Sequence, residues 1–447
     1  MRKGRSGWWG AGVPRAWAAA VVALVVMTVA AAASAQVQGL YYREVKQDGK
    51  IFVFNTDERY KAFEKTGEMG QNITLVGHGP QGETVVAENA TALDLFNFKH
   101  DLPAYERPTP KPAVATAAPL PFKVGVLGYI SYQDGTSGGK DYSKFVLKRG
   151  YLNVESKVLP YLSVRWTTDI TQDSSGDVKP RMKYLYGRFT GHQMGFVTDP
   201  MLEFGLVHMP WLDYEEAVNG YRMQDTMFTE RNGFFNSADF GITIGGLFGG
   251  KMPAEYQKTV SSAYPGRYGS FMIGVYNGTG YHAAEHNTNK VLEGRISIRP
   301  LPDVVPGLQF SYFGIHGKGN TEAAPDWNLN LGWVSYESRY VVLTGQYLKG
   351  TGNQAGTAAD SMGKSLDRDG WSVFADGKIT PQWSVIARYD HFDPNTKLDN
   401  DAQKRSIGGI AYHLGKGNVL LLDYEQLKFD NGSPTDKRGQ LTLQVKF

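Results

Sequence analysis

The chain ends with Leu441-Thr442-Leu443-Gln444-Val445-Lys446-Phe447, in which apolar and polar residues alternate strictly. This two-residue period is typical of a β-strand whose two faces meet different surroundings. Because the pattern runs to the last residue, no tail follows that would cover the edge of such a strand. We therefore expect another strand to pair with it, and in a closed barrel that partner is the first strand. An edge strand of a soluble β-sandwich is the alternative that these residues leave open.

The start of the chain predicts export. The basic residues Arg2, Lys3, Arg5 and Arg15 precede an apolar run from Trp17 to Ala33. Ala33-Ser34-Ala35 then fits the small-residue rule for a secretory cleavage site. We expect residues 1–35 to be a signal peptide, with an uncleaved helical anchor as the alternative.

The composition limits the possible partners and chemistry. Without the four basic residues of the expected signal peptide, the 47 Lys and Arg become 43, against 44 Asp and Glu. Such a balanced chain gives no support for a nucleic-acid partner, which would need a clustered basic face. The absence of Cys excludes disulfides and thiolate chemistry. Beyond the signal no apolar run approaches the 18 or so residues of a spanning helix, so a membrane form would have to be a barrel.

The sequence divides into two expected domains. Six prolines between Asp101 and Pro121 predict an extended linker over residues 101–121. Residues 36–100 predict a small α+β periplasmic domain. Its elements are a hairpin turning at Asp48-Gly49, a helix from Asp57 to Gly67 after a Thr56 cap, and a second hairpin over residues 73–89.

Residues 122–447 predict an all-β domain, a 16-stranded antiparallel transmembrane β-barrel. Strand-like runs begin near Phe122, Lys144, Tyr161, Pro180, Met201, Ala238, Arg267, Val291, Gly307, Trp327, Tyr340, Gly370, Gln382, Lys404, Gly417 and Lys437. We expect short turns at one end and long loops at the other. The long link GGKMPAEYQKTVSSAYPG breaks this rule, so it is either an excursion or a sign of 14 or 18 strands.

The two faces of these runs differ in chemistry. Leu162, Val164 and Trp166 alternate with Ser163, Arg165 and Thr167, which predicts a lipid face and a wet lumen. This alternation predicts a set of charged pore-lining side chains. They are Arg149, Arg165, Lys183, Arg295, Arg299, Lys378, Arg388, Asp169, Glu293 and Asp390. Aromatic residues expected in interfacial girdles are Trp166, Trp327, Trp333, Trp371, Trp383, Tyr412 and Tyr424.

The link from Pro210 to Phe235 is too long for a turn and too aromatic for disorder. Folded inward it would narrow the channel, whereas a lid on the extracellular rim is the alternative. Its charged side chains, offered to the solute, are Asp213, Glu215, Glu216, Arg222, Asp225, Glu230 and Arg231.

No motif predicts catalysis. His282-Ala-Ala-Glu285-His286 matches an inverted zinc-protease pattern, but it follows a Gly-rich segment in an expected loop, where no helix would set the spacing of the imidazoles. Ser and His residues form no local arrangement typical of a barrel lipase. We expect no enzyme, no cofactor and no metal.

Several blocks resemble the phosphate-selective porin family, the O and P type. They are KFVLKRGYLNVESKVLPYLSVRWTTDI, MLEFGLVHMPW, FTERNGFFNSADFGITIGG and YGSFMIGVYNGTG followed by VLEGRISIRPLP. The terminal Phe447 is also similar to the C-terminal signature of bacterial outer-membrane barrels. The resemblance implies a 16-stranded barrel in the outer membrane, often a homotrimer, with an inward loop and an anion-conducting lumen.

The expected function is that of an outer-membrane porin that lets small hydrophilic solutes or ions diffuse passively. Phosphate selectivity would need converging Arg and Lys. Instead, the expected lumen charges nearly balance, and the long link carries five acids against two Arg. The main rival hypothesis is a barrel that anchors residues 36–100, which would bind cell wall or a partner protein.

Overall fold

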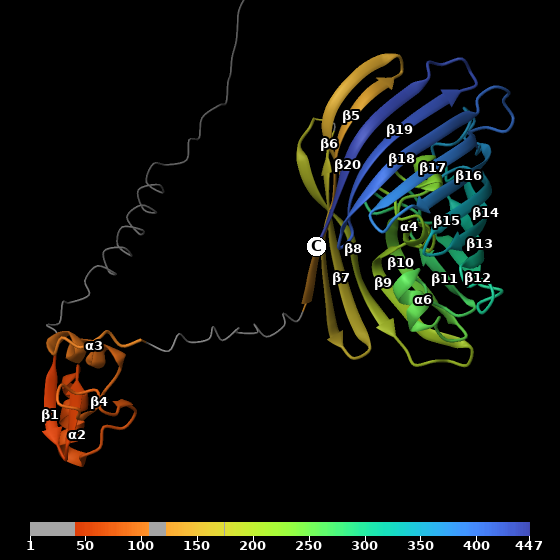
Figure 1. Cartoon of the computed structure of the whole chain (residues 1–447). Helices are drawn as coiled ribbons and strands as arrows, with labels where there is room; N and C mark the ends of the chain where they lie inside the picture. The colour runs from red at the N-terminus through yellow and green to blue at the C-terminus, as the bar shows by residue number, and fades with distance from the viewer. Residues whose placement is uncertain (1–40, 107–121, 174) are drawn as a thin grey trace, which may run out of the picture. The chain divides into compact units, whose positions relative to one another are not determined.

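The computed structural model describes residues 41–106 and 122–447, apart from residue 174 (Figure 1). The expected signal peptide and residues 107–121 of the expected linker lie outside the described residues. The chain forms two compact units, one on each side of this gap. Among the described residues, no helix is both long and apolar enough to cross a membrane.

The N-terminal unit is a small α+β fold. It consists of β1 (Arg43–Gln47), β2 (Lys50–Phe54), α2 (Asp57–Thr66), β3 (Ile73–Leu75), β4 (Thr84–Ala87) and α3 (Ala90–Lys99). The sheet has the order β1-β2-β4-β3. Asp48 and Gly49 form the turn of the first hairpin, both with positive φ, as a tight turn of this kind requires. Both expected hairpins and the expected helix are therefore present.

The two helices of this unit pack on opposite faces of its sheet. Ile51 and Val53 form a core with Leu93 and Phe96 of α3. Phe54 forms a second core with Tyr60 and Phe63 of α2. Because neighbouring side chains of a strand point to opposite faces, β2 serves both cores. Helix α3, which the sequence analysis did not predict, begins where the Asn89 side chain accepts a hydrogen bond from Ala92 N at 3.0 Å.

The C-terminal unit is a closed antiparallel barrel of sixteen strands, β5 to β20 (Figure 1). The strands are β5 (Phe122–Ser137), β6 (Lys140–Leu159), β7 (Leu162–Gln172), β8 (Val178–Thr190), β9 (Val197–His208), β10 (Ala238–Phe248), β11 (Gly269–Tyr276), β12 (Val291–Ile298), β13 (Leu308–Lys318), β14 (Asp326–Glu337), β15 (Val341–Thr351), β16 (Asp367–Lys378), β17 (Trp383–Asp393), β18 (Gln403–Gly415), β19 (Asn418–Phe429) and β20 (Asp436–Lys446). The prediction of sixteen strands is confirmed.

The last strand closes the barrel on the first. Leu441 lies opposite Tyr132 and Lys446 lies opposite Leu127. Val126 N donates to the carbonyl oxygen of Phe447 at 2.8 Å, so the pairing continues to the final residue. The alternating C-terminal stretch thus pairs with the first strand of a barrel, as expected, and is not the free edge of a sandwich.

The barrel is polar inside and apolar outside along much of its wall. In β17, Ser384, Arg388 and Asp390 are buried, whereas Trp383 and Val385 are 47% and 43% exposed. In β12, Glu293 and Arg295 are buried while Leu292 and Ile296 are exposed. A soluble protein would bury the apolar set, so this pattern is the one expected of a wall that faces lipid.

Two expectations about the barrel are wrong. The β5–β6 link is a two-residue turn, residues 138–139, although it lies at the end of the long loops. Trp327 and Trp333 are 0% and 4% exposed and point inward, so they belong to no girdle. The β10–β11 link, residues 249–268, is an excursion that contains helix α6 (Ala254–Thr259).

Candidate functional site

The long link between β9 and β10, residues 209–237, lies inside the barrel, and we call it the inner loop. It contains helices α4 (Leu212–Val218) and α5 (Phe228–Arg231). It leaves the wall where His208 pairs with Ala238 and contacts strands on the far side. For example, Arg438 of β20 contacts Asp225, and Arg388 of β17 contacts the carbonyl of Thr226. The loop therefore crosses the lumen.

An apolar face fixes the first half of the inner loop to the wall. Trp211 and Tyr214 are 0% and 1% exposed. The Trp211 ring stacks on Phe313 at 5.5 Å and meets Trp333 edge-on at 5.3 Å. Burying a large aromatic side chain contributes roughly 2–3 kcal/mol. This contact explains why Trp333 faces inward, since it covers the loop and not a membrane interface.

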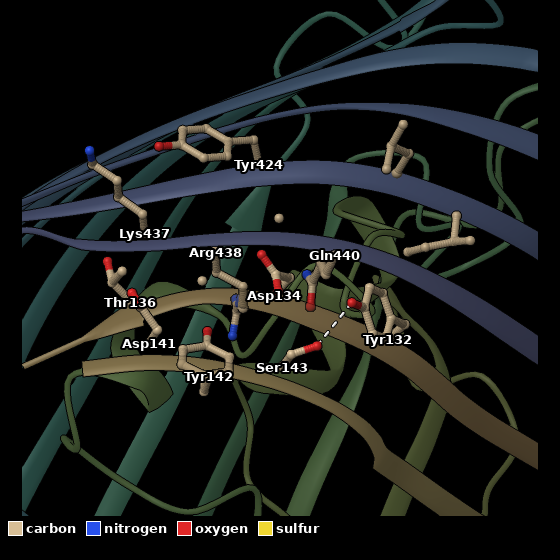
Figure 2. A pocket seen from close by; sticks show the side chains of 14 residues that line it. Tyr132, Asp134, Thr136, Asp141, Tyr142, Ser143, Tyr424, Lys437, Arg438 and Gln440 are labelled. Carbon is tan, nitrogen blue, oxygen red and sulfur yellow. Dashed lines mark hydrogen bonds between the residues drawn. The ribbon is translucent and has the colours of Figure 1, made fainter. Parts of the chain in front are cut away.

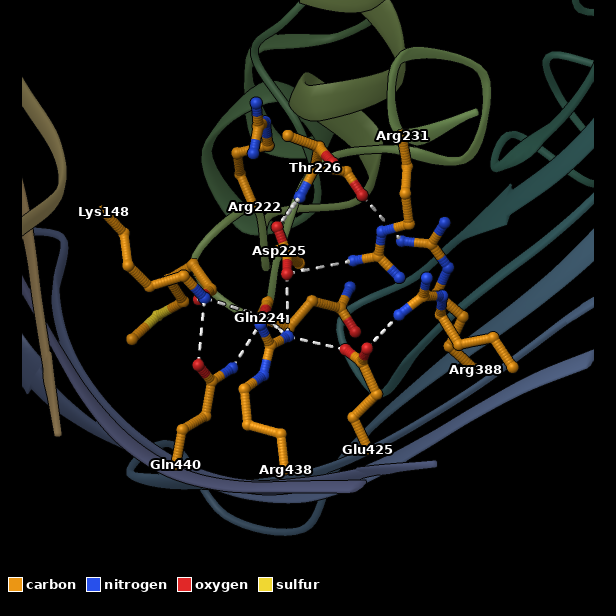
Figure 3. Close-up of polar contacts among 12 residues, drawn as sticks. Lys148, Arg222, Gln224, Asp225, Thr226, Arg231, Arg388, Glu425, Arg438 and Gln440 are labelled. Carbon is orange, nitrogen blue, oxygen red and sulfur yellow. Dashed lines mark hydrogen bonds and ion pairs between the residues drawn. The ribbon is translucent and has the colours of Figure 1, made fainter. Parts of the chain in front are cut away.

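A polar network holds the tip of the inner loop (Figure 3). Lys148 donates to the carbonyl oxygens of Met223 and Gln224 at 2.8 and 2.9 Å. Gln440 donates to the carbonyl of Gln224 at 2.6 Å, and Arg438 donates to Asp225 at 2.7 Å. The loop is thus fixed at both its base and its tip.

Most acids of the inner loop are neutralised by arginines. Glu216 pairs with Arg149 at 3.3 Å and with Arg222 at 2.7 Å. Arg222 also pairs with Glu230 at 2.7 Å. Burial opposes ionisation of Glu216, but the two arginines outweigh it and lower its pKa to about 2. The excess of acids in the loop sequence is therefore largely cancelled in the fold.

Glu215 has a different environment from Glu216. Its carboxylate accepts hydrogen bonds from Trp211 Nε1 at 2.8 Å and Gln346 Nε2 at 2.6 Å. Burial is the dominant influence and raises the pKa of Glu215 to about 7. Its partners are Trp211, which precedes α4, and Gln346 of β15, so it joins the loop to the wall.

A cavity of ≈ 370 Å³ lies between the inner loop and strands β5 to β8, and we call it the constriction cavity. Its lining combines cationic and aromatic side chains of the wall with loop residues. The lining residues are Leu127, Arg149, Tyr151, Asn153, Arg165, Lys183, Tyr184, Leu212, Asp213, Glu216, Ala217, Ser237 and Tyr264. Of the loop residues proposed from the sequence, Asp213 and Glu216 reach this cavity.

Tyrosines interleave with the cations of this wall. The Arg149 guanidinium lies 4.6 Å from the Tyr151 ring centroid, and that of Arg165 lies 4.7 Å from the Tyr184 ring. Lys183 lies 4.5 Å from the Tyr151 ring and donates to its hydroxyl. Within the described part of the chain, Lys183 forms no ion pair. Sequence alternation gave the cations but not these tyrosines, although Arg149 and Tyr151 share a face at a spacing of two.

Two β-bulges each bring a lysine and the residue after it to the lumen side, and of these lysines only Lys148 was not proposed from the sequence. The register of β6 shifts beside Tyr129, so Lys148 and Arg149 both face the lumen side. The register of β8 shifts beside Thr167 and Thr168 of β7, which leaves Lys183 unpaired, and Lys183 and Tyr184 are both 3% exposed. A bulge inserts one unpaired residue and redirects a side chain. Strict alternation from the sequence could not reveal either shift.

The other charged positions proposed from the sequence lie elsewhere. Arg295, Arg388, Asp390, Arg222, Asp225, Glu230 and Arg231 hold the inner loop or contact its network. Asp169 pairs with Arg181 at 2.7 Å. Arg299 is buried among the links at the short-turn end, where Lys378 also donates to Ser338 O. Glu293 is 2% exposed, and its Oε2 has no hydrogen-bond partner among the described residues.

A hollow of ≈ 850 Å³ lies where β5, β6, β19 and β20 adjoin (Figure 2). It is lined partly by the outward-facing Leu422 and Leu441, which are 60% and 43% exposed. The Tyr132 hydroxyl meets Ser143 Oγ at 2.9 Å across it. It shares no lining residue with the constriction cavity.

The His282–His286 segment lies in the β11–β12 link outside any helix, so no helical turn spaces its imidazoles. Within it, Glu285 pairs with Lys290 at 2.8 Å. The described residues contain no group of three His, Asp or Glu side chains suited to a metal ion.

No known family model matches the sequence, and no curated protein is detectably similar to it. Among solved structures, the fold is similar to that of an anion-selective porin from Comamonas acidovorans. That match has 11% identity and a TM-score of 0.52, and it covers 73% of this chain and 99% of the other. OmpF of Salmonella typhi, in complex with daunomycin, matches with 11% identity and a TM-score of 0.49 over 73% and 97%. OpdQ of Pseudomonas aeruginosa matches with 11% identity and a TM-score of 0.41 over 73% and 98%. The first of these likenesses supports the barrel fold.

Proposed function

We propose that this chain is a porin of the bacterial outer membrane, through which small hydrophilic solutes diffuse down their gradients. The observation that carries this proposal is the inner loop, which crosses a closed barrel and leaves a polar cavity of ≈ 370 Å³ beside it. The apolar outer face supports placement in lipid, because only closed barrels and helices satisfy their backbone groups there.

We further propose that the constriction favours anions. Arg149, Lys183 and Arg165 come together on one wall of the cavity, whose lining acids are Asp213 and an already paired Glu216. Glu155, which is not a lining residue, lies 3.9 Å from Arg165. An anion that sheds water at a narrow point must recover that energy from charge-assisted hydrogen bonds. Lys183 and Arg165 supply such donors, and the sequence resemblance to phosphate-selective porins points to phosphate among the solutes.

Planar-bilayer recordings of the folded mature chain test this function. We expect stepwise conductance. In asymmetric potassium chloride, the reversal potential should lie closer to the equilibrium potential of chloride than to that of potassium. Folded protein that inserts but gives no steps would refute the channel. Steps with potassium preference would refute the anion selectivity alone, and chloride current unaffected by added phosphate would refute phosphate as a solute.

Three further parts of the hypothesis come from the sequence. They are a homotrimer, a signal peptide at residues 1–35, and a periplasmic position for residues 36–100 with a cell-wall or protein partner. Chemical cross-linking in native membranes tests the trimer, and protease protection of residues 36–100 in intact cells tests their location.

A further inference from the structure

The β10–β11 link is a second segment that enters the barrel, from the end opposite to the inner loop. It runs over residues 249–268 and is closed on itself, since Met252 N donates to the carbonyl of Pro265 at 2.8 Å. Lys251 and Gly266 form an isolated antiparallel bridge at its base. Arg299 of the wall holds the link by donating to the Tyr256 hydroxyl at 3.0 Å and to Gly266 O at 3.3 Å. The link is therefore a fixed structural element.

Tyr264 of this link reaches the inner loop. Its ring lies 5.1 Å from that of Tyr214 in α4, with a T-shaped geometry. The guanidinium of Arg295 lies 4.1 Å from the Tyr214 ring and 4.9 Å from the Tyr264 ring. Arg295 also donates to the carbonyl of Pro210 at 3.0 Å, at the start of the inner loop. One buried arginine thus joins both inward segments.

The backbone of Tyr264 carries strain that fits this placement. Its φ is 44°, a left-handed value that is unusual for a bulky aromatic residue. Such strain persists only where surrounding contacts enforce it, and it concentrates at functional sites. Here it directs the ring towards the constriction cavity, and Tyr264 is the one lining residue of that cavity that the link contributes.

We propose that the β10–β11 link is a second constriction segment, in which Tyr264 limits the size of the solutes that pass beside Asp213 and Arg165. This inference rests on the proposed channel function. The passage is then bounded on three sides, by the cationic wall, by the inner loop and by this link. The link makes the constriction narrower than the inner loop alone would.

Single-channel recordings of the full mature chain test the proposal with Tyr264→Ala, Tyr264→Phe and a matched control, Tyr268→Ala. Tyr268 lies four residues along the same link, but its ring packs on Phe196 and is 40% exposed on the outer face. A phenol group occupies on the order of 100 Å³. Against the ≈ 370 Å³ of the cavity, its loss should raise conductance by about a quarter. Tyr264→Phe and Tyr268→Ala should conduct like the parent chain.

A second arm avoids any folding defect of Tyr264→Ala. The chain has no Cys, so Tyr264→Cys and Tyr268→Cys each supply one thiol for a sulfonate-bearing methanethiosulfonate reagent. The reagent should reduce current only in Tyr264→Cys. The second constriction is refuted, while the channel stands, if the parent chain conducts, Tyr264→Ala has the same conductance as the parent, and the reagent leaves the current of Tyr264→Cys unchanged. A parent chain that never conducts refutes the channel itself.

Discussion

Arg438, on the last strand of the barrel, donates to the carboxylate of Asp225 at the tip of the inner loop, with 2.7 Å between Nη2 and Oδ2. The same guanidinium donates to Glu425 of β19 at 2.6 Å (Figure 3). The strand that closes the barrel on β5 thus also fixes the far end of the loop. Arg438 therefore couples barrel closure to the position of the loop tip, together with Gln440 of the same strand.

Removing this contact should loosen the loop tip. We predict that Asp225→Asn increases current flicker and lowers the free energy of unfolding by roughly 1–3 kcal/mol, because a partly buried charge loses its partner. Bilayer recordings and urea unfolding in vesicles measure the two effects. Asp430→Asn is the control, since Asp430 pairs with Lys404 on an exposed part of the barrel and should cost less than about 1 kcal/mol. Equal effects of the two substitutions would contradict the role of the Arg438–Asp225 contact in fixing the loop tip.

The charge preference should depend on Lys183. A unit charge about 4 Å from a passing ion contributes about 1 kcal/mol in water. Lys183→Gln should therefore lower the ratio of chloride to potassium permeability by up to about fivefold, as reversal potentials would show. Lys290→Gln removes an exposed cation that pairs with Glu285 in an outer link, and should leave the ratio unchanged. An unchanged ratio in Lys183→Gln would remove Lys183 from the selectivity mechanism.

The sequence predicted those features that depend on residues close together in the chain, and it missed those that depend on contacts between distant segments. Alternation is local, and it placed the starts of most strands within three residues of their observed positions. It does not say which face is the lumen. In β14, Trp327, Leu329, Leu331 and Trp333 face inward because the inner loop covers them, while Asn330 faces out. The bulges at Lys148 and Lys183 were equally hidden, since a register shift depends on the neighbouring strand.

The same limit applies to the candidate site. The sequence predicted a functional role for the long link and proposed Arg149, Arg165 and Lys183 on the wall. It could not show that Glu216 and Arg149 pair across 67 residues of sequence, and so it overestimated the acidity of the loop. The sequence did not predict the position of Tyr264, because no residue near it in the sequence distinguishes a link that folds into the barrel from an exposed one.

Two neighbouring carboxyls of α4 should give opposite pH dependences. The pKa of Glu215 is raised from 4.5 to about 7 by burial, so the folded chain retains a proton that the unfolded chain releases. Stability therefore falls as pH rises from 4.5 to 7, by up to about 3 kcal/mol. The pKa of Glu216 is lowered to about 2, since Arg149 and Arg222 outweigh its burial, so its contribution is lost as pH falls from 4.5 to 2.

Urea unfolding in vesicles across pH 2–8 measures both effects. Glu215→Gln should make the decline in the upper window shallower and leave the lower one unchanged, and Glu216→Gln should do the reverse. A Glu215→Gln profile that declines as steeply as that of the parent chain between pH 4.5 and 7 would mean that Glu215 does not contribute to the decline.

The assignment of the two faces can be tested on adjacent residues of β6. Leu152 is 40% exposed on the apolar outer face, whereas Asn153 lines the constriction cavity. Because the chain has no Cys, Leu152→Cys and Asn153→Cys each introduce one labelling position. A fluorophore at position 152 should be quenched by nitroxides on lipid acyl chains, and one at position 153 by a water-soluble quencher. Side chains one position apart point in opposite directions, so the two responses should be reciprocal. Stronger lipid quenching at position 153 than at position 152 would mean that the Asn153 face of β6 meets lipid, and it would exclude a water-filled lumen on that face.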